Sequence, residues 1–286
     1  MPELPEVETV CRGLSGVLKG RRLARVVVRR KDLRIPFPPR FAEALTGRRI
    51  ENIRRRAKYM LLDLDKAEVL IVHLGMSGRM VVDASGAPPG AHDHVILTTD
   101  DGVEVRFNDP RRFGLMTLAP SSGLDGHKLF RHLGPDPLDA AFTPEAFSAA
   151  LKGRKTSIKA ALLDQRVVVG VGNIYACESL HRAGISPLRS AGTVAGKRAS
   201  RLVPAIKAVL TEAIAAGGSS LRDHVQPSGE LGYFQHAWKV YGREGESCAR
   251  CRPESDKKAA PIKGKGTVRR ITQGGRSSFY CARCQM

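Results

Sequence analysis

The stretch Tyr59-Met60-Leu61-Leu62-Asp63-Leu64, followed closely by Val69-Leu70-Ile71-Val72-His73-Leu74, decides the fold of the N-terminal half. Both runs are short and rich in large apolar residues. Similar runs occur on both sides, between Arg21 and Leu118, and turn-forming clusters such as Ser85-Gly86-Ala87-Pro88-Pro89-Gly90 separate them. Short strands at this spacing are typical of a β-sandwich or a barrel. We therefore expect a sheet domain over this part of the chain.

In front of the predicted sheet stands Met1-Pro2-Glu3-Leu4-Pro5-Glu6, at the start of a helical stretch that we expect over Glu3 to Gly13. Removal of Met1 would leave the secondary amine of Pro2 as the chain terminus, with carboxylates close behind it. An α-amine titrates near ~7.7 to 8.0 against ~10.4 for lysine, so more of it is neutral and nucleophilic at pH 7. The alternative is structural: Pro2 opens a short helix whose positive end the glutamates complement.

Beyond the sheet the pattern becomes helical. Gly134-Pro135-Asp136-Pro137 is typical of a linker, and Thr143-Pro144 then supplies an N-cap with proline at the first helical position. The longest predicted helix covers Ala199 to Ala216, because its apolar residues form one stripe that Gly217-Gly218 ends. The segment from Ser219 to Glu246 predicts a long loop, and such loops are often functional.

Four of the six cysteines form two pairs, Cys248-x-x-Cys251 and Cys281-x-x-Cys284. Each pair can offer two thiolates to a tetrahedral zinc ion, whereas disulfides, the alternative, are disfavoured in a cytoplasmic chain. The segment 252–280 between the pairs is longer than the ~15 to 20 residues of a compact ribbon, so we expect an enlarged hairpin. A solvated, mobile tip is the favoured interpretation, and extra phosphate contacts are the alternative. The segment's basic residues include Lys257, Lys258, Lys263, Lys265, Arg269 and Arg270.

Composition limits the class of protein. A chain of 286 residues with 42% hydrophobic content is long enough for two or three domains with real cores. Its 47 Lys and Arg against 28 Asp and Glu give a net charge of +19, which indicates a polyanionic partner, although charge that serves solubility alone is the alternative. The sequence has neither an uncharged apolar run of ~18 residues nor the start of a signal peptide. We therefore expect a cytoplasmic protein that does not enter the membrane.

Taken together, these motifs resemble the Fpg/Nei family of base-excision repair glycosylases, and in particular its bacterial formamidopyrimidine-DNA glycosylase (Fpg) branch. The similarity starts at the segment from Pro2 to Val10, includes the cysteine pairs and extends through the whole chain in family order. The other matching motifs are Arg56-Ala57-Lys58-Tyr59, His73-Leu74-Gly75-Met76-Ser77-Gly78, His92-Asp93-His94, Asp109-Pro110-Arg111-Arg112-Phe113-Gly114, Gly170-Val171-Gly172-Asn173-Ile174-Tyr175 and Gly275-Arg276-Ser277-Ser278-Phe279-Tyr280-Cys281.

The resemblance implies an α+β multidomain protein that holds damaged double-stranded DNA in a cleft. Residues 1–134 would form a catalytic β-sandwich with an N-terminal helix. Residues 135–240 would form a helix-two-turn-helix DNA-binding domain with a lesion-capping loop, and residues 241–286 a zinc ribbon with one structural Zn²⁺. We expect a monomer in the bacterial cytoplasm, associated with the nucleoid.

The resemblance also implies the chemistry. Pro2 attacks the anomeric carbon of the sugar, expels the damaged base and forms a Schiff base, and β- and δ-elimination then cleave the strand. Glu3 is the acid that helps to open the sugar and shuttles protons, while Glu6 supports the terminal helix and the sugar environment. Lys58 grips the phosphate near the lesion, and Arg276 holds the lesion-flanking phosphates. Without the resemblance, Lys58 is one more cation of a solvated basic strand.

Damage inside a duplex is reached only if the nucleotide leaves the stack, and other groups must then fill the gap. Met76, Arg111 and Phe113 match the family's void-filling side chains: Met and Phe wedge between bases, and Arg bonds the orphaned partner base. Core packing is the alternative for the two apolar residues. DNA-binding positions of the family are matched by His73, His92, Arg111, Arg154 and Asn173, the last of which starts a predicted helix suited to hold a phosphate.

Two features favour the purine branch of the family: Leu4, and the loop from Gly217 to Phe234, which resembles the segment that folds over oxidised purines. Ser219-Ser220 replaces the threonines common there and leaves base preference slightly open. We expect removal of 8-oxoguanine and formamidopyrimidines opposite cytosine. The alternatives are a Nei-type glycosylase for oxidised pyrimidines and a zinc-ribbon DNA-binding protein without catalysis, which would give Pro2-Glu3 no role.

Overall fold

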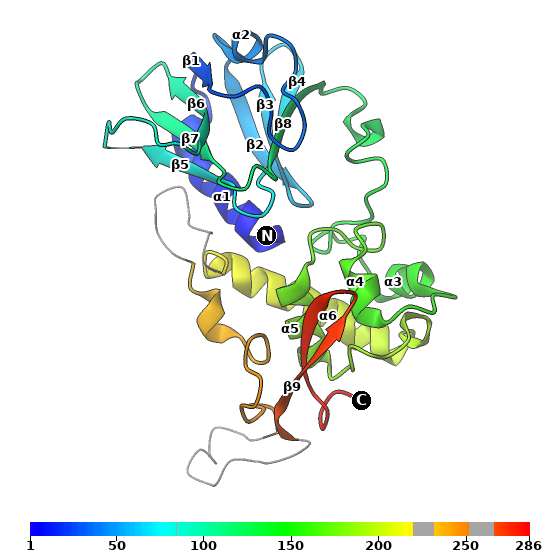
Figure 1. Cartoon of the computed structure of the whole chain (residues 1–286). Helices are drawn as coiled ribbons and strands as arrows, with labels where there is room; N and C mark the ends of the chain where they lie inside the picture. The colour runs from blue at the N-terminus through cyan, green and yellow to red at the C-terminus, as the bar shows by residue number, and fades with distance from the viewer. Residues whose placement is uncertain (84, 220–231, 252–265) are drawn as a thin grey trace. The chain divides into compact units, whose positions relative to one another are not determined.

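The computed structural model describes residues 1–83, 85–219, 232–251 and 266–286 (Figure 1). The chain divides into two compact units. The first comprises Met1–Arg131 and Ala213–Gln235, and the second His132–Glu212 and His236–Met286. The cysteine-rich C-terminus thus belongs to the same unit as the helices that precede it, and the three-domain limits expected above stay a prediction.

The first unit contains two antiparallel four-stranded sheets, as expected for a sandwich. Strand order is β1-β6-β7-β5 in one sheet and β2-β3-β4-β8 in the other. The strands are β1 (Leu23–Val28), β2 (Ile50–Arg56), β3 (Tyr59–Leu64), β4 (Glu68–His73), β5 (Arg79–Asp83), β6 (Asp93–Thr99), β7 (Glu104–Asn108) and β8 (Leu115–Pro120). The two apolar runs that decide the fold are β3 and β4, and they pair directly, with Tyr59 opposite His73.

One core joins the two sheets and the N-terminal helix α1 (Leu4–Leu18), and the short helix α2 (Phe41–Leu45) also contributes to it. Leu70 and Val72 of β4, and Val105 and Phe107 of β7, are fully buried there, and Leu14 of α1 packs in the same core. The two-residue spacing puts each pair on one face of its strand. The predicted β-sandwich is confirmed.

Helix α1 is longer than the sequence pattern indicated. We expected it to end near Gly13, whereas it continues to Leu18. The reason is packing: Leu14 and Leu18 extend the buried stripe that begins at Val7, and burial of two leucines outweighs the cost of the two helical glycines, Gly13 and Gly16, at about 1 kcal/mol each.

The second unit is mainly helical. Its helical elements are α3 (Pro144–Leu151), α4 (Ile158–Leu163), α5 (Asn173–Ala183), the 3-10 turn η2 (Ala191–Thr193) and α6 (Lys197–Ala215). The last three residues of α6 belong to the first unit, and so does the 3-10 turn η1 (Leu124–Gly126). Thr143 caps α3, since its hydroxyl accepts the Ala146 N–H at 3.2 Å, as the sequence predicted. Gly217 and Gly218 follow α6 with φ of 75° and 79°, a conformation that favours glycine.

After the turn η3 (Phe234–Ala237), the C-terminus forms an antiparallel hairpin of β9 (Val268–Gln273) and β10 (Arg276–Cys281). Val268 and Phe279 pack on Cys177 of α5 in a small buried cluster. The expected hairpin tip is only partly testable, because 252–265 lies outside the described residues. Arg269 and Arg270 were expected in that tip. This was wrong, since both lie in β9 and pair with residues of β10.

Among the described helices, none has the length and apolar run needed to cross a membrane.

Candidate active site

Pro2 and Glu3 are both buried immediately before α1. Glu3 is the N-cap residue, and it forms a capping box with Glu6: the Glu3 N–H donates to Glu6 Oε2 at 2.8 Å, and the Glu3 carboxylate accepts the N–H of Glu6. Pro5, not Pro2, occupies the first helical turn. The alternative in which Pro2 opens the helix is therefore wrong, and Pro2 lies just outside the helix beside an anchored carboxylate.

Glu6 has a second partner in a distant segment of the same unit. Its Oε1 accepts the backbone N–H of Ser219 at 2.9 Å, and only 3% of the residue is exposed. Gly218 lies so close that a Cβ there would be 3.2 Å from Glu6 Cγ. Glu6 thus fixes the start of the expected lesion-capping loop to the start of α1. The middle of that loop, 220–231, lies outside the described residues.

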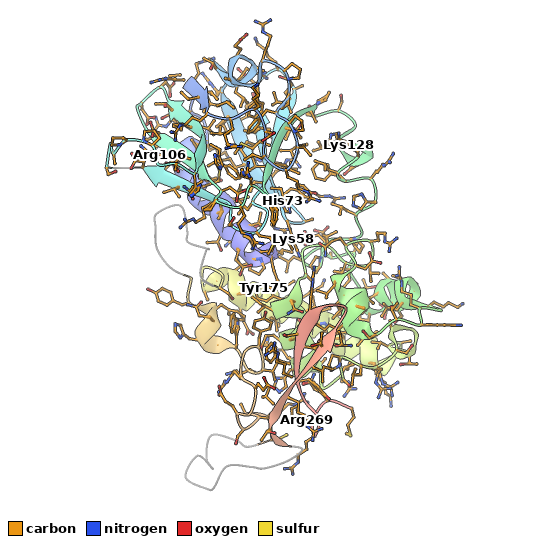
Figure 2. The ribbon with its side chains drawn as sticks, viewed as in Figure 1. Lys58, His73, Arg106, Lys128, Tyr175 and Arg269 are labelled. Atoms are coloured by element: carbon orange, nitrogen blue, oxygen red, sulfur yellow. The ribbon has the colours of Figure 1, made fainter. Side chains whose placement is uncertain are left out.

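Lys58 and His73 lie close together at one end of the sheet β2-β3-β4-β8 (Figure 2). Lys58 follows the tight turn at Ala57 and is 7% exposed, and the His73 ring lies 4.8 Å from that of Tyr59. Burial, with the charges of Lys58 and Arg34, lowers the pKa of His73 to about 4. Its Nδ1 accepts the Gly75 N–H at 2.9 Å, so Nε2 carries the proton. His73 is therefore an uncharged donor at neutral pH.

The three void-filling candidates lie on two neighbouring loops. Met76 is 39% exposed and Phe113 is 44% exposed, so the alternative of core packing is wrong for both. The guanidinium of Arg111 lies 5.0 Å from the centre of the Phe113 ring, within cation–π range. The loops touch at Gly75, where a Cβ would lie 2.3 Å from the Phe113 carbonyl carbon. Two exposed apolar side chains and a guanidinium are thus presented together.

Four residues that sequence reasoning did not single out support these loops. The fully buried Asp109 carboxylate accepts the Ser77 hydroxyl at 2.6 Å and the Gly114 N–H at 2.8 Å. Arg34 lies beside them, and its N–H donates to the Gly114 carbonyl at 3.0 Å. Asp109, Ser77 and Gly114 stand inside quoted motifs, but partners drawn from separate loops leave no signal in sequence spacing.

The expected DNA-contact residue His92 is exposed in the loop that leads into β6. Its carbonyl accepts the Asp109 N–H at 3.0 Å. Arg154, in the second unit, is partly exposed, and its guanidinium lies 3.3 Å from the Asp164 carboxylate. Both side chains can therefore reach a ligand, and their assignment to phosphates stays a prediction.

Asn173 begins α5, with Gly172 as its N-cap residue. Its Nδ2 donates to the Ser277 carbonyl at 2.9 Å, and Lys159, itself 1% exposed, donates to the same oxygen at 2.9 Å. The residue before that carbonyl is Arg276, exposed at the start of β10 and lining an open hollow with Lys159 and Asp164. The structure thus bonds the Asn173 side chain to the hairpin at the residue that follows Arg276.

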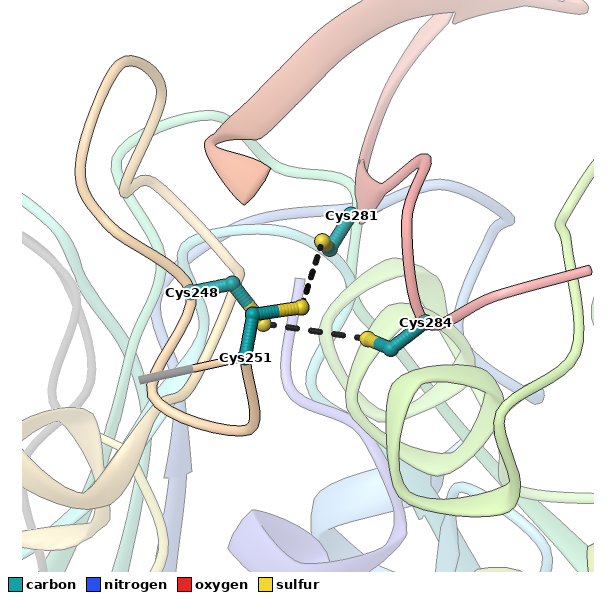
Figure 3. Close-up of side chains that lie close together, drawn as sticks. All are labelled: Cys248, Cys251, Cys281 and Cys284. Carbon is teal, nitrogen blue, oxygen red and sulfur yellow. Dashed lines mark hydrogen bonds between the residues drawn. The ribbon is translucent and has the colours of Figure 1, made fainter. Parts of the chain in front are cut away.

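The four paired cysteines gather at the base of the same hairpin (Figure 3). The Sγ atoms of Cys248 and Cys284 are 3.7 Å apart, those of Cys251 and Cys281 are 3.6 Å apart, and all four lie within 4.8 Å of one another. These distances exclude S–S bonds of about 2.05 Å. Four thiolates at about 2.3 Å from a tetrahedral zinc ion would be about 3.8 Å apart. The donor set therefore fits such an ion.

His181 of α5 lies against this cluster. Its Nε2 is 3.2 Å from Cys248 Sγ, and only 4% of the residue is exposed. Hydrogen bonds from Cys284 and then His181 lower the pKa of Cys248 to about 3. Burial and the neighbouring thiols raise the pKa of Cys251 and Cys284, so Cys248 is the member of the cluster that already favours the metal-binding thiolate form.

Comparison with known proteins agrees with this geometry. Residues 1–116 match the model of the formamidopyrimidine-DNA glycosylase N-terminal domain, and residues 133–225 match that of the formamidopyrimidine-DNA glycosylase H2TH domain. A curated formamidopyrimidine-DNA glycosylase from Acidiphilium cryptum is 58% identical over 285 residues, covering all of both chains.

Solved structures are similar over nearly the whole length. The crystal structure of MutM (Fpg) from Thermus thermophilus is 38% identical with a TM-score of 0.84, over 99% of this chain and 98% of that one. Two structures of Lactococcus lactis Fpg cover all of both chains. One, a mutant with Fapy-dG DNA, is 30% identical with a TM-score of 0.87; the other, wild type with oxidised-pyrimidine DNA, is 31% identical with a TM-score of 0.86.

A sandwich with a proline-glutamate start, an H2TH domain and a four-cysteine hairpin defines a DNA-repair glycosylase with AP-lyase activity. The chain belongs to the formamidopyrimidine-DNA glycosylase family. The predicted family, fold and enzyme class are confirmed.

Proposed function

We propose that this enzyme removes 8-oxoguanine and formamidopyrimidines from duplex DNA opposite cytosine, through a Schiff base on Pro2, and then cleaves the strand by β,δ-elimination. The observation that carries the proposal is the pair Pro2 and Glu3, buried together at the start of α1. A secondary amine and a carboxyl at one point are what nucleophilic attack on a sugar carbon requires.

The steps assign one task to each group. With Met1 removed, the neutral Pro2 nitrogen bonds to the anomeric carbon, and the bond to the damaged base breaks with its electron pair on the base. The departing base takes up the proton that the Pro2 nitrogen loses, so the lone pair of the nitrogen can open the sugar ring. Glu3 gives a proton to the sugar oxygen as the ring opens to the imine, and it accepts protons during elimination. The Glu6 carboxylate holds Glu3 in place by accepting a hydrogen bond from the Glu3 backbone N–H. Lys58 and Arg276 neutralise the phosphates beside the lesion.

Binding uses the remaining residues. Met76, Arg111 and Phe113 fill the gap left by the extruded nucleotide, at an unstacking cost of a few kcal/mol. His73 donates a neutral hydrogen bond to a phosphate. His92, Arg154 and Asn173 contact other phosphates, and the exposure of the first and the partial exposure of the second support this.

The preference for purines rests on the relatives. The Lactococcus lactis enzyme is solved with Fapy-dG DNA and also with oxidised-pyrimidine DNA, so binding of a pyrimidine lesion alone does not identify the Nei branch. We expect faster release of 8-oxoguanine than of oxidised pyrimidines in matched duplexes at equal enzyme concentration. The opposite order would support the Nei-type alternative.

We further propose that Cys248, Cys251, Cys281 and Cys284 hold one structural Zn²⁺, which would tie the base of the hairpin together. The distances between the thiols support a tetrahedral ion. We also propose a monomer that works in the cytoplasm at the nucleoid, in keeping with the net charge of +19.

Borohydride trapping tests the central step. When intact mass shows that Met1 is absent, reduction of the imine should link the enzyme covalently to lesion-containing duplex. Undamaged duplex should give no covalent adduct. A sample that retains Met1 is the matched control, because its amide blocks the Pro2 nitrogen. Equal nicking by both samples would refute Pro2 as the nucleophile, and absence of any adduct or nicking would favour the non-catalytic alternative.

A further inference from the structure

Asp109 lies where three loops of the first unit meet. Its carboxylate binds the Ser77 hydroxyl at 2.6 Å and the Gly114 N–H at 2.8 Å, one oxygen to each loop. Its backbone carbonyl is 2.8 Å from Nε2 of the buried His94, and its N–H donates to the His92 carbonyl at 3.0 Å. Asp109 is 0% exposed, so all of these bonds are shielded from water.

The bonds of Asp109 lead directly to the three wedge residues. Ser77 follows Met76, and its oxygen also accepts the Arg111 N–H at 3.2 Å, so one hydroxyl joins the two loops. Gly114 follows Phe113. Arg112, between Arg111 and Phe113, has a φ of 58°, a left-handed conformation that residues with a Cβ rarely adopt without support. The Asp109–Gly114 bond closes this turn and supplies the support.

We infer that Asp109 is a positioning residue that holds Met76, Arg111 and Phe113 in one rigid wedge, ready to fill the gap beside an extruded nucleotide. The inference rests on the proposed function of these three side chains. It adds that the wedge is preorganised by a buried carboxylate that never touches DNA. The two loops then need little ordering when the wedge inserts into DNA. A loosely held wedge would insert more slowly, because its loops would have to be ordered at that step.

Two variants separate positioning from folding. Asp109→Asn keeps the shape and an acceptor for the Gly114 N–H, but it replaces the charged acceptor of the Ser77 hydroxyl with an amide N–H, so the charge-assisted bond between the two loops is lost. Ser77→Ala removes the same link from the other side. Thr99→Val is the matched control, because Thr99 is a 2%-exposed residue of the same unit whose hydroxyl also donates to a carboxylate, Asp101, at 2.6 Å, away from the wedge loops. Thermal unfolding of each variant is the check that it still folds.

The first readout is fluorescence of 2-aminopurine beside a tetrahydrofuran abasic analogue in a duplex, which reports insertion without any covalent chemistry. Asp109→Asn and Ser77→Ala should lower the insertion rate and the release of 8-oxoguanine from duplex by about tenfold, the effect of one buried hydrogen bond. The double variant should be no slower than either single one, since both break the same link.

The second readout is cleavage at an abasic site in a single strand, where there is no stack to fill. Both variants should cleave it within about twofold of wild type, as should Thr99→Val in every assay. Unchanged insertion in Asp109→Asn and Ser77→Ala, or equal losses on single strands, would overturn the inference. Failure of the wild-type enzyme to form an imine would instead refute the Pro2 chemistry, and the fluorescence comparison would still decide the role of Asp109.

Discussion

At the scale of single residues, the most informative group is His73, because its environment removes a charge that the sequence suggests it could carry. Burial and the nearby Lys58 and Arg34 lower its pKa to about 4. The ring is anchored through Nδ1 to Gly75, so Nε2 is left as the donor. A phosphate contact from His73 therefore gives direction without neutralising charge.

This predicts a pH dependence of stability. Between pH 6.5 and 4 the unfolded chain binds a proton at His73 that the folded chain does not, so the free energy of unfolding falls as the pH falls through this window. At pH 5 the loss relative to pH 7.5 should be about 2 kcal/mol greater in wild type than in His73→Gln. Urea unfolding at the two pH values measures it, and a ring titration by NMR with a midpoint near 6.5 would contradict it.

The same argument predicts different salt effects at neighbouring positions. Lys58→Met should reduce the slope of log K against log salt by about 0.9, because one counterion-releasing contact is lost. His73→Gln should weaken DNA binding with the slope unchanged. Binding titrations at four salt concentrations compare the two variants, and an equal drop in slope would mean that His73 binds DNA as a cation.

For single residues, the sequence allowed prediction of which residue types occupy the positions of the family motifs. Pro2, Met76 and Phe113 were singled out by chemistry and resemblance, and the structure places the first beside Glu3 and exposes the other two. Asp109 was not singled out, because its bond to Ser77 joins two loops whose approach depends on sheet packing, while its bond to Gly114 lies within its own turn. A buried hydrogen bond between distant segments has no periodic signal.

At the scale of elements, α1 depends on the two oxygens of Glu6, one for its own capping box and one for Ser219. Glu6→Ala should lower the free energy of unfolding by about 1 to 3 kcal/mol, since two buried N–H groups lose their acceptor. Urea unfolding measures the change. Glu8→Ala is the control on the same helix, because the Glu8 carboxylate pairs with Arg12 and Arg55 and not with the start of the helix. An equal loss of stability in Glu8→Ala would contradict a special role for Glu6.

The hairpin of β9 and β10 should depend on metal. Chelation is expected to unfold the hairpin and reduce the salt slope of DNA binding by about 0.9, the contribution of Arg276, while the first unit stays folded. Hydrogen exchange and metal analysis follow both effects. Cys284→Ala should lose the metal, whereas Cys11→Ala should keep it, because burial raises the pKa of Cys11 to about 12 and it lies in α1. Full DNA affinity after complete metal removal would refute the prediction.

Elements were predictable where local chemistry decides them. Thr143 and Pro144 fixed the start of α3, and Gly217 and Gly218 the end of α6. The end of α1 was missed because Leu14 and Leu18 are held by the sandwich core, which a local pattern does not contain. Arg269 and Arg270 were misplaced for a similar reason, since strand pairing overrode their charge.

At the scale of the whole molecule, the net charge of +19 should dominate binding. Three cations are proposed to meet phosphates, Lys58, Arg154 and Arg276, so log K should fall by at least about 2.7 per log unit of salt. Fluorescence anisotropy on lesion-containing duplex measures the slope. An affinity independent of salt would contradict both the contacts and the polyanionic partner.

Family and sandwich were predictable over the full length because many separate motifs occur in one order. The division into units was less accessible: the segment 213–235 joins the N-terminal unit although it follows the helices in sequence. That arrangement depends on contacts such as Glu6 with Ser219, which only the folded chain brings together.

The carbonyl of Ser277, which accepts from both Lys159 and Asn173, has an evolutionary consequence. Every amino acid supplies that oxygen, so an exchange at position 277 removes only the exposed bond that the Ser277 hydroxyl accepts from Arg270 Nε at 3.0 Å, while the arginine beside it keeps its place. Selection should instead fall on the two donors, whose replacement no compensating exchange at 277 can repair.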